Sequence, residues 1–223
     1  MIENEKHLKE VLSVLQKEGI LDNVILIGSW CLLFYKYVFD NFEPTIRTTD
    51  IDFYVPDSKK IKARNGVIKS FKDINYDIIY DSITHKSMFI SPDGFELEFL
   101  TKLNRENLAC IRLGNTGIFA ESLPYVDIFT GNYIEINYEG IKLKVASPAS
   151  YVIQKLLINN ARGDKKQKDI ESIKHVVFYI GASIKYCDEL STLFKSLPKK
   201  WKQKVKLTVL ENNIEALYPL LDN

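Results

Sequence analysis

The fold is decided by LIGSW at positions 26–30 and RTTDIDFYV at positions 47–55. The apolar, β-branched run 24–27 predicts a buried strand that ends at Gly28-Ser29, and residues 30–39 behind it predict a buried helix. Residues 50–55 predict a second strand, which Pro56-Asp57 ends. The sequence therefore places a strand, a tight turn and a helix next to a strand that carries two acids.

The two acids are Asp50 and Asp52, which lie two positions apart. Side chains at that spacing in a strand point to the same face, so Ile51 and Phe53 point to the opposite, apolar face. Two like charges side by side repel and need a cation or good solvation. Magnesium fits, because it prefers carboxylate oxygens and substrate phosphates. A strand with one wet face is the alternative for an Asp-x-Asp motif taken alone.

The Gly28-Ser29 turn adds context to the acids. The free N–H groups at the start of the following helix attract a phosphate, and Ser29 adds a hydroxyl donor. A Gly-Ser pair at a strand end is by itself usually only a turn. The combination of this turn with two acids indicates a site for a metal-bound nucleoside triphosphate.

A third acid is expected on a neighbouring strand, in FELEFL at positions 95–100. Glu96 and Glu98 share one face of that strand, opposite Leu97. We favour Glu98, whose flanking residues repeat the pattern around Asp52. Glu96 in that role, or two solvated glutamates, remain open alternatives.

The rest of the chain predicts an α/β (α+β) lobe, a mixed sheet flanked by helices, followed by a helical C-terminal lobe. Ser147-Pro148 is typical of a helix start, and strand signals largely stop there. We therefore predict domains at 1–146 and 147–223. Glu139-Gly140 predicts a turn that tolerates positive φ. Further helices are predicted at 5–18 and 58–71, and further strands at 76–80, 86–90, 95–100, 125–129, 132–138 and 141–145.

Charge is divided unevenly along a chain whose net charge is +1. The stretch 155–206 carries 13 Lys and Arg against 5 Asp and Glu, which predicts a basic second lobe beside an acidic first one. Three scattered cysteines fit neither a disulfide framework nor a zinc site. The start of the sequence does not resemble a signal peptide, and no apolar run reaches the roughly 20 residues of a membrane span. We expect a cytoplasmic protein.

The motifs LIGSW, RTTDIDFYV and FELEFLT together resemble the nucleotidyltransferase superfamily, which includes polymerase-β-like enzymes and AbiEii-type toxins. The resemblance is closest to bacterial and archaeal nucleotidyltransferase-like proteins of the AbiEii-type group. It implies that Gly28 and Ser29 hold the triphosphate. It also implies that Asp50, Asp52 and Glu98 hold two Mg²⁺ ions, with Mn²⁺ as a substitute.

The resemblance continues in SPASYVIQKLLINNARGDKKQKDIESI at positions 147–173. It implies that Lys155, Lys168 and Asp169 face the nucleotide. The alternative for the lysine-rich part is one solvated helix face. Arg47 is a further candidate for the triphosphate, because its planar fork suits phosphate oxygens, although an ordinary surface arginine is the alternative.

Two features depart from the family pattern. Gly28 and Asp50 are 22 positions apart, which is longer than the spacing in many members, and the third acid is Glu instead of Asp. Neither departure removes an oxygen ligand. The longer stem of Glu would alter the metal geometry and the rate.

The leading hypothesis is transfer of a nucleoside monophosphate from a nucleoside triphosphate to an acceptor hydroxyl on RNA, a protein or a small molecule. KKWKQKVKL at positions 199–207 makes RNA a candidate, although this stretch also fits an exposed helix with Trp201 and Val205 turned inward. The second hypothesis is a nucleotide-binding or regulatory module without catalysis, as one half of a toxin-antitoxin pair. The third is a structural interaction protein, in which the acids only face water.

Overall fold

The computed structural model describes residues 3–44, 48–103 and 108–221, and the chain divides into two compact units. Unit 1 comprises Met1–Phe34 and Ile46–Ala146, and unit 2 comprises Tyr35–Thr45 and Ser147–Asn223. The segment 35–45 thus groups with the C-terminal part of the chain. No helix within the described residues is long and apolar enough to cross a membrane.

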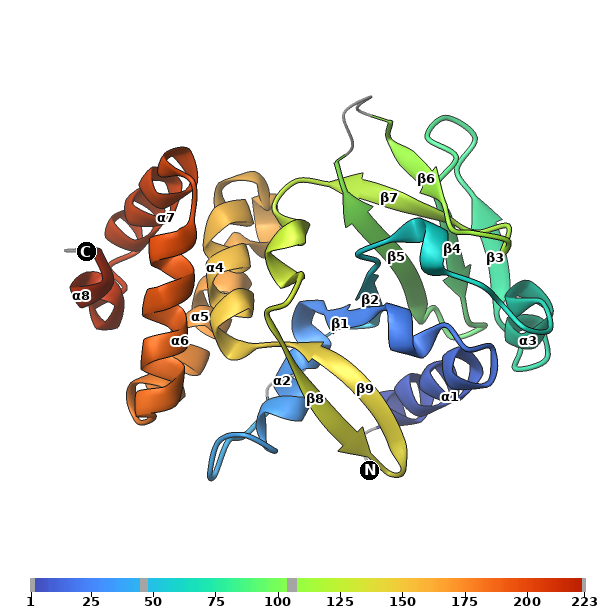
Figure 1. Cartoon of the computed structure of the whole chain (residues 1–223), viewed down its shortest axis with the longest axis horizontal. Helices are drawn as coiled ribbons and strands as arrows, with labels where there is room; N and C mark the ends of the chain where they lie inside the picture. The colour runs from blue at the N-terminus through green and yellow to red at the C-terminus, as the bar shows by residue number, and fades with distance from the viewer. Residues whose placement is uncertain (1–2, 45–47, 104–107, 222–223) are drawn as a thin grey trace. The chain divides into compact units, whose positions relative to one another are not determined.

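Unit 1 is built on one mixed sheet, to which nine strands of the described chain contribute (Figure 1). Its main order is β3-β4-β5-β2-β1-β9-β8, and β7 pairs with β5 and with β6. β2 runs parallel to β5 and antiparallel to β1. The strands are β1 Ile25–Ile27, β2 Asp50–Tyr54, β3 Asp77–Tyr80, β4 Ser87–Ile90, β5 Glu96–Lys102, β6 Cys110–Arg112, β7 Phe119–Leu123, β8 Tyr133–Tyr138 and β9 Ile141–Ala146.

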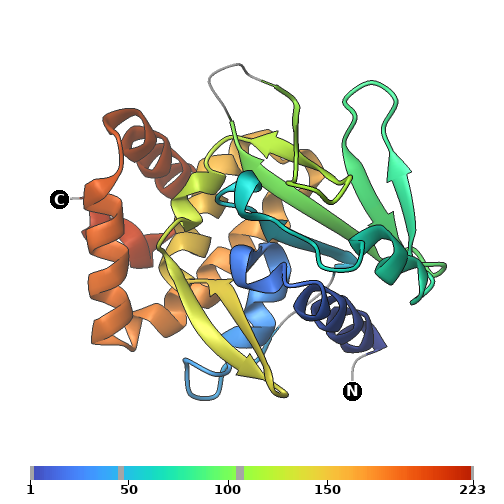
Figure 2. The same ribbon diagram turned by 45° about the vertical axis from the view of Figure 1, so that its right-hand side comes forward.

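Helices α1 (Glu3–Lys17) and α3 (Val67–Lys72) pack against each other beside this sheet (Figures 1 and 2). α1 is amphipathic because its apolar residues recur every three or four positions. Phe71 of α3 stacks on Phe89 of β4 with 4.3 Å between ring centroids. Phe89 is the register partner of Leu97, so the helices cover the face of the sheet that carries Leu97. A mixed sheet flanked by helices confirms the predicted α+β class.

Unit 2 is helical, and α4 packs against α5, α6 and α7. The Ser147 hydroxyl accepts a hydrogen bond from the Ser150 N–H at 3.2 Å, and Pro148 is the first residue of α4. This cap confirms the helix start that the sequence predicts. Backbone oxygens of the 35–45 segment accept hydrogen bonds from Tyr179 and His175 of α5. The helices are α4 Pro148–Ile158, α5 Lys166–Gly181, α6 Ile184–Ser196, α7 Lys199–Glu211 and α8 Tyr218–Leu221.

The helix predicted at 58–71 is wrong over its first part, which is a 3₁₀ turn at Ser58–Lys60 followed by a loop to α3. Backbone N–H groups of this loop donate hydrogen bonds to a residue far away in the sequence, instead of to the carbonyl oxygens of a helix. The Arg64 N–H bonds the Glu18 carbonyl at 3.2 Å, and the Asn65 N–H bonds the Glu18 carboxylate at 2.8 Å. The Ser70 hydroxyl donates to the other carboxylate oxygen at 2.6 Å. A buried glutamate at the end of α1 therefore holds this loop.

Two other regions differ from the prediction. The strand predicted at 125–129 is wrong, because Val126–Phe129 forms a 3₁₀ turn entered through Tyr125 at φ 67°. Its apolar residues are buried, and burial alone does not distinguish a short turn from a strand. The helix predicted at 30–39 is short: after a 3₁₀ turn at Gly28–Trp30, α2 covers only Cys31–Tyr35. Strands β6 and β7 were not predicted.

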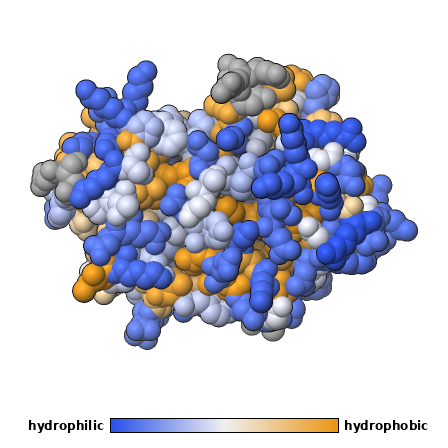
Figure 3. Space-filling model, in the orientation of Figure 1, coloured by the Kyte–Doolittle hydropathy of each residue, from blue (hydrophilic) through white to orange (hydrophobic). Residues whose placement is uncertain are grey.

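The surface is mainly hydrophilic, with smaller hydrophobic areas between the charged side chains on the face drawn in Figure 3. Large apolar side chains that stay exposed include Ile83 in unit 1 and Phe178 and Ile184 in unit 2. Single exposed apolar residues are ordinary on a protein surface.

We predict that Glu18→Gln destabilises the protein by about 2 kcal/mol, because it removes charge-assisted hydrogen bonds from a buried group. Burial alone raises the pKa of Glu18, but the bonds from Ser70 and from the Asn65 N–H outweigh it and lower the pKa from 4.5. The stabilisation is therefore complete above pH 4.5 and is lost as the pH falls through the lower, folded-state pKa.

Urea unfolding between pH 3 and pH 7 measures this difference, with Glu5→Gln on the same helix as the control. A Glu18→Gln variant as stable as the wild type at pH 7 would contradict the prediction.

Candidate active site

The turn after β1 brings Gly28 against a carboxylate. Gly28 has φ 72°, in the left-handed region that glycine enters without strain. A Cβ atom at Gly28 would lie 2.4 Å from Oδ2 of Asp52. No real pair of atoms of this kind comes so close, so the Asp52 carboxylate occupies space that only a glycine leaves open.

Strand register explains why Asp52 meets this turn. β1 and β2 are antiparallel and place Ile27 opposite Asp52, so the residue after Ile27 lies beside the aspartate. β2 and β5 are parallel and pair Asp50 with Glu96 and Asp52 with Glu98. Register partners on neighbouring strands point to the same face of a sheet.

Four carboxylates, those of Asp50, Asp52, Glu96 and Glu98, therefore share one face of the sheet, which we call the acid face. All four residues are half-buried, whereas Ile51, Phe53, Leu97 and Phe99 on the other face are buried. The structure thus places Asp50 and Asp52 as the sequence predicts, with both candidate third acids beside them.

The residues around Asp50 and Gly28 complete this part of the site. The Asp50 N–H donates to the Thr48 hydroxyl at 3.2 Å, which ties the start of β2 to the preceding segment. Ser29 is half-buried in the 3₁₀ turn that follows β1. Arg47 lies outside the described residues.

Glu98 is engaged by a lysine that the sequence analysis did not single out. Lys86 Nζ lies 2.8 Å from Oε1 of Glu98 and 2.8 Å from Oε2 of Glu121. Burial lowers the pKa of Lys86, but the bonds to Glu121 and Glu98 outweigh it and raise the pKa above its ordinary value. The sequence carried no signal for this pair, because it depends on the strand register that sets Met88, two positions after Lys86, opposite Glu98.

The donor chemistry of the acid face fits a hard divalent cation at Asp50 and Asp52, where carboxylate oxygens are half-exposed beside an open turn. Glu98, the favoured candidate for the third acid, is paired with Lys86. In the described chain, no group of three or more His, Cys, Asp and Glu side chains is gathered so that it could hold a metal ion. Asp50 and Asp52 thus share the face beside Gly28, whereas one oxygen of Glu98 is paired with Lys86.

In unit 2, two of the three residues that the resemblance implicates, Lys155 and Asp169, belong to a buried ion-pair network. Lys155 Nζ lies 2.8 Å from Oδ1 of Asp169, and both side chains are about 95% buried. Arg162 Nε donates to the other Asp169 oxygen at 3.0 Å and was not predicted. Lys168 is exposed. Lys155 and Asp169 thus bind each other within unit 2, and their contact with a nucleotide stays a prediction.

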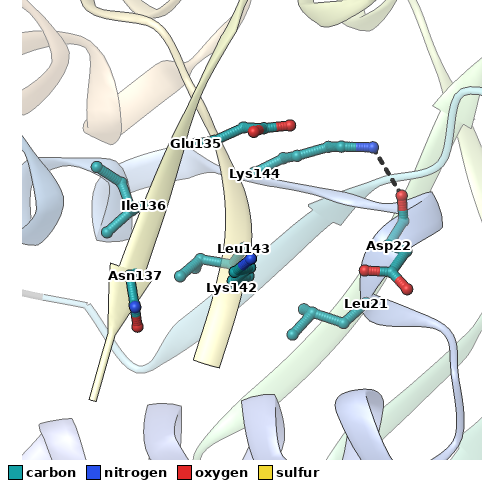
Figure 4. A pocket seen from close by; sticks show the side chains of 8 residues that line it. All are labelled: Leu21, Asp22, Glu135, Ile136, Asn137, Lys142, Leu143 and Lys144. Carbon is teal, nitrogen blue, oxygen red and sulfur yellow. Dashed lines mark hydrogen bonds between the residues drawn. The ribbon is translucent and has the colours of Figure 1, made fainter. Parts of the chain in front are cut away.

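A pocket of about 320 Å³ lies between the 3₁₀ turn Leu21–Asn23 and the β8–β9 hairpin (Figure 4). Its hairpin side carries the cross-strand pairs Glu135 with Lys144 and Asn137 with Lys142. Lys144 Nζ donates to the carbonyl oxygen of Asp22 at 2.7 Å, which links the two sides (Figure 4). Of the predicted site residues that the structure describes, none lines this pocket.

The structure has an α+β sheet in which a glycine turn lies beside an Asp-x-Asp strand. The predicted class of protein, a nucleotidyltransferase, rests on this combination. A family model described as Nucleotidyltransferase matches residues 6–187. The chain therefore belongs to this nucleotidyltransferase family. Nucleotidyl transfer is thus its general class of activity, while the predicted AbiEii-type grouping stays a prediction.

One solved structure shows the same fold, and a second is similar to this chain. The antibiotic-resistance factor ANT(2'')-Ia, determined in solution, is 12% identical with a TM-score of 0.51 over 95% of this chain and 98% of that chain. An antigenic nucleotidyltransferase-like protein from Paracoccidioides brasiliensis is 21% identical with a TM-score of 0.49 over 89% of this chain and 92% of that chain. Comparison with curated proteins finds no match.

We predict that Gly28→Ala abolishes the stabilisation of this protein by magnesium and ATP, because the new Cβ displaces the Asp52 carboxylate. Gly131→Ala is the matched control: Gly131 also has positive φ, 77°, but nothing lies within 4 Å of its Cβ position. Each variant loses about 1 to 2 kcal/mol from backbone strain.

Thermal unfolding with and without magnesium and ATP separates the two effects. Gly131→Ala should keep the ligand-induced rise in melting temperature, and Gly28→Ala should lose it. An undiminished rise in Gly28→Ala would contradict the assignment of the turn.

Proposed function

We propose that this protein moves a nucleoside monophosphate from a nucleoside triphosphate to an acceptor hydroxyl, with Asp50, Asp52 and Glu98 as ligands of Mg²⁺, or of Mn²⁺ in its place. One observation carries the proposal. The Asp52 carboxylate lies over the space left open by Gly28, on the face it shares with Asp50 and Glu98. This arrangement supports a site where a triphosphate at the turn and a cation at the acids meet.

In this reaction, the acceptor oxygen forms a bond to the α-phosphorus, and the bond from that phosphorus to the bridging oxygen breaks. Pyrophosphate leaves, and the hydroxyl proton passes to a base, a role that we assign to Glu98. Bound magnesium would offset the negative charge that develops on the phosphate oxygens. Asp50, Asp52 and Glu98 would hold the cation, and the Gly28-Ser29 turn would hold the phosphates, as the family resemblance implies.

The finer assignments of nucleotide contacts follow from the family resemblance, except that of Arg47, which follows from the planar fork of its side chain. We assign triphosphate contacts to Ser29 and Arg47, and nucleotide contacts to Lys155, Lys168 and Asp169. Lys155 and Asp169 form a buried ion pair in unit 2, and Lys168 is exposed at the start of α5.

RNA is one candidate acceptor, through the basic segment 199–207. Lys199 and Lys200 are exposed at the start of α7, which supports contact with a phosphate backbone. The alternative, a helix that packs through its apolar side, is also supported, because Val205 is buried and Lys206 donates to the carbonyl oxygen of Leu221. A protein or small-molecule acceptor therefore stays within the proposal.

The ion pair between Lys86 and Glu98 favours a second candidate, a module that binds nucleotide without turnover. In that case the third acid would stay with Lys86, and the protein would act through binding, for example within a toxin-antitoxin pair. Binding without transfer separates this candidate from the enzyme.

We expect label from α-³²P nucleoside triphosphates, but not from γ-³²P, to reach an acceptor in cell extract when magnesium is present. Asp50→Asn and Asp52→Asn should each lower this transfer at least about 100-fold, because they weaken charge compensation in the transition state. Asp73→Asn, at an exposed position outside the site, is the control.

Ribonuclease or protease treatment of the extract then distinguishes RNA from protein acceptors. Full transfer by both aspartate variants would remove the mechanism. Saturable nucleotide binding without any transfer would support the binding module.

A further inference from the structure

Lys86 joins two carboxylates that come from different strands of the sheet. Glu98 lies on β5 and Glu121 on β7, and each places one oxygen 2.8 Å from Lys86 Nζ. The three side chains are 17% to 33% exposed. The ammonium group therefore bridges two strands at a half-buried position.

This bridge lies on the acid face. Met88 is the register partner of Glu98, and Lys86 lies two positions before it, so both point to the side of Glu98. Glu121 is the register partner of Leu100, which shares the face of Glu98. Lys86 is thus a cation among carboxylates that the proposed function assigns to metal binding.

We propose that Lys86 is a positioning residue that holds the third acid until a divalent cation displaces it. This inference rests on the proposed function. The Lys86 ammonium group places a positive charge 2.8 Å from Oε1 of Glu98 and so opposes the approach of a second cation to that carboxylate. A divalent ion at the acid face therefore competes with the ammonium group for Glu98, and Lys86 sets the affinity of the site for metal.

Glu121 is the second carboxylate that binds Lys86, so it also affects the competition between Lys86 and a metal ion for Glu98. With both carboxylates present, the ammonium group is shared, and Glu121 retains it when Glu98 turns to a metal ion. Without the charge of Glu121, the Lys86 ammonium group pairs with Glu98 alone. A metal ion then has to displace an ammonium group that is no longer shared with a second carboxylate. Removing Lys86 and removing the Glu121 charge should therefore change metal affinity in opposite directions.

The test is calorimetric titration of the full chain with Mn²⁺ at pH 7 without nucleotide. Lys86→Met should bind Mn²⁺ about 10-fold more tightly than the wild type, a shift that allows for partial solvent screening of this half-buried charge. Lys86→Arg should restore the wild-type affinity. Glu121→Gln should bind Mn²⁺ more weakly than the wild type.

Lys102→Met is the matched control. Lys102 is exposed on the same strand as Glu98 and, by alternation, on the same face. This variant removes the same charge without touching the bridge, so its Mn²⁺ affinity should stay within about 2-fold of the wild type. A purely structural Lys86 would change the melting temperature but not this pattern.

An equal gain in Mn²⁺ affinity in Lys102→Met and Lys86→Met would overturn the proposal. An unchanged Mn²⁺ affinity in Lys86→Met would overturn it as well. Should Lys86→Met not fold, a Glu121→Gln variant that binds Mn²⁺ as tightly as the wild type would overturn it too. Asp52→Asn separates this from failure of the proposed function. Weaker Mn²⁺ binding in Asp52→Asn with an unchanged Lys86→Met rejects only the role of Lys86, whereas equal binding by Asp52→Asn and the wild type rejects the metal site itself.

Discussion

The contact between Gly28 and the Asp52 carboxylate is the constraint on which the site depends. A side chain at position 28 would occupy the space of Oδ2, so the turn can have only a glycine while Asp52 keeps this position. The antiparallel register of β1 and β2 brings the two residues together. One close approach thus links the end of a buried strand to the acids that the proposed chemistry uses.

The second constraint is electrostatic. Asp50, Asp52, Glu96 and Glu98 share a face because β2 and β5 are parallel and in register, and like charges at this spacing repel. Lys86 relieves part of that repulsion at Glu98. Carboxylates gathered on one face are stabilised by nearby cations. Lys86 supplies a positive charge at Glu98, and the proposed function assigns a metal ion to Asp50 and Asp52.

The sequence predicts the parts of this structure that depend on local chemistry. Alternation placed Asp50 and Asp52 on one face, and β-branched residues before Gly28 marked a buried strand. Long-range partners could not be predicted: the loop before α3 follows from bonds to Glu18, and the pairing of Lys86 with Glu98 depends on strand register. The 3₁₀ turn after Tyr125 was missed because its buried residues resemble a strand.

A double-mutant cycle on Mn²⁺ affinity measures whether Gly28 acts through Asp52. Gly28→Ala should weaken binding in the wild type but add nothing in an Asp52→Asn background, because both changes remove the same carboxylate from its position. Losses that simply add in the double variant would mean that Gly28 does not act through Asp52, and would contradict the account.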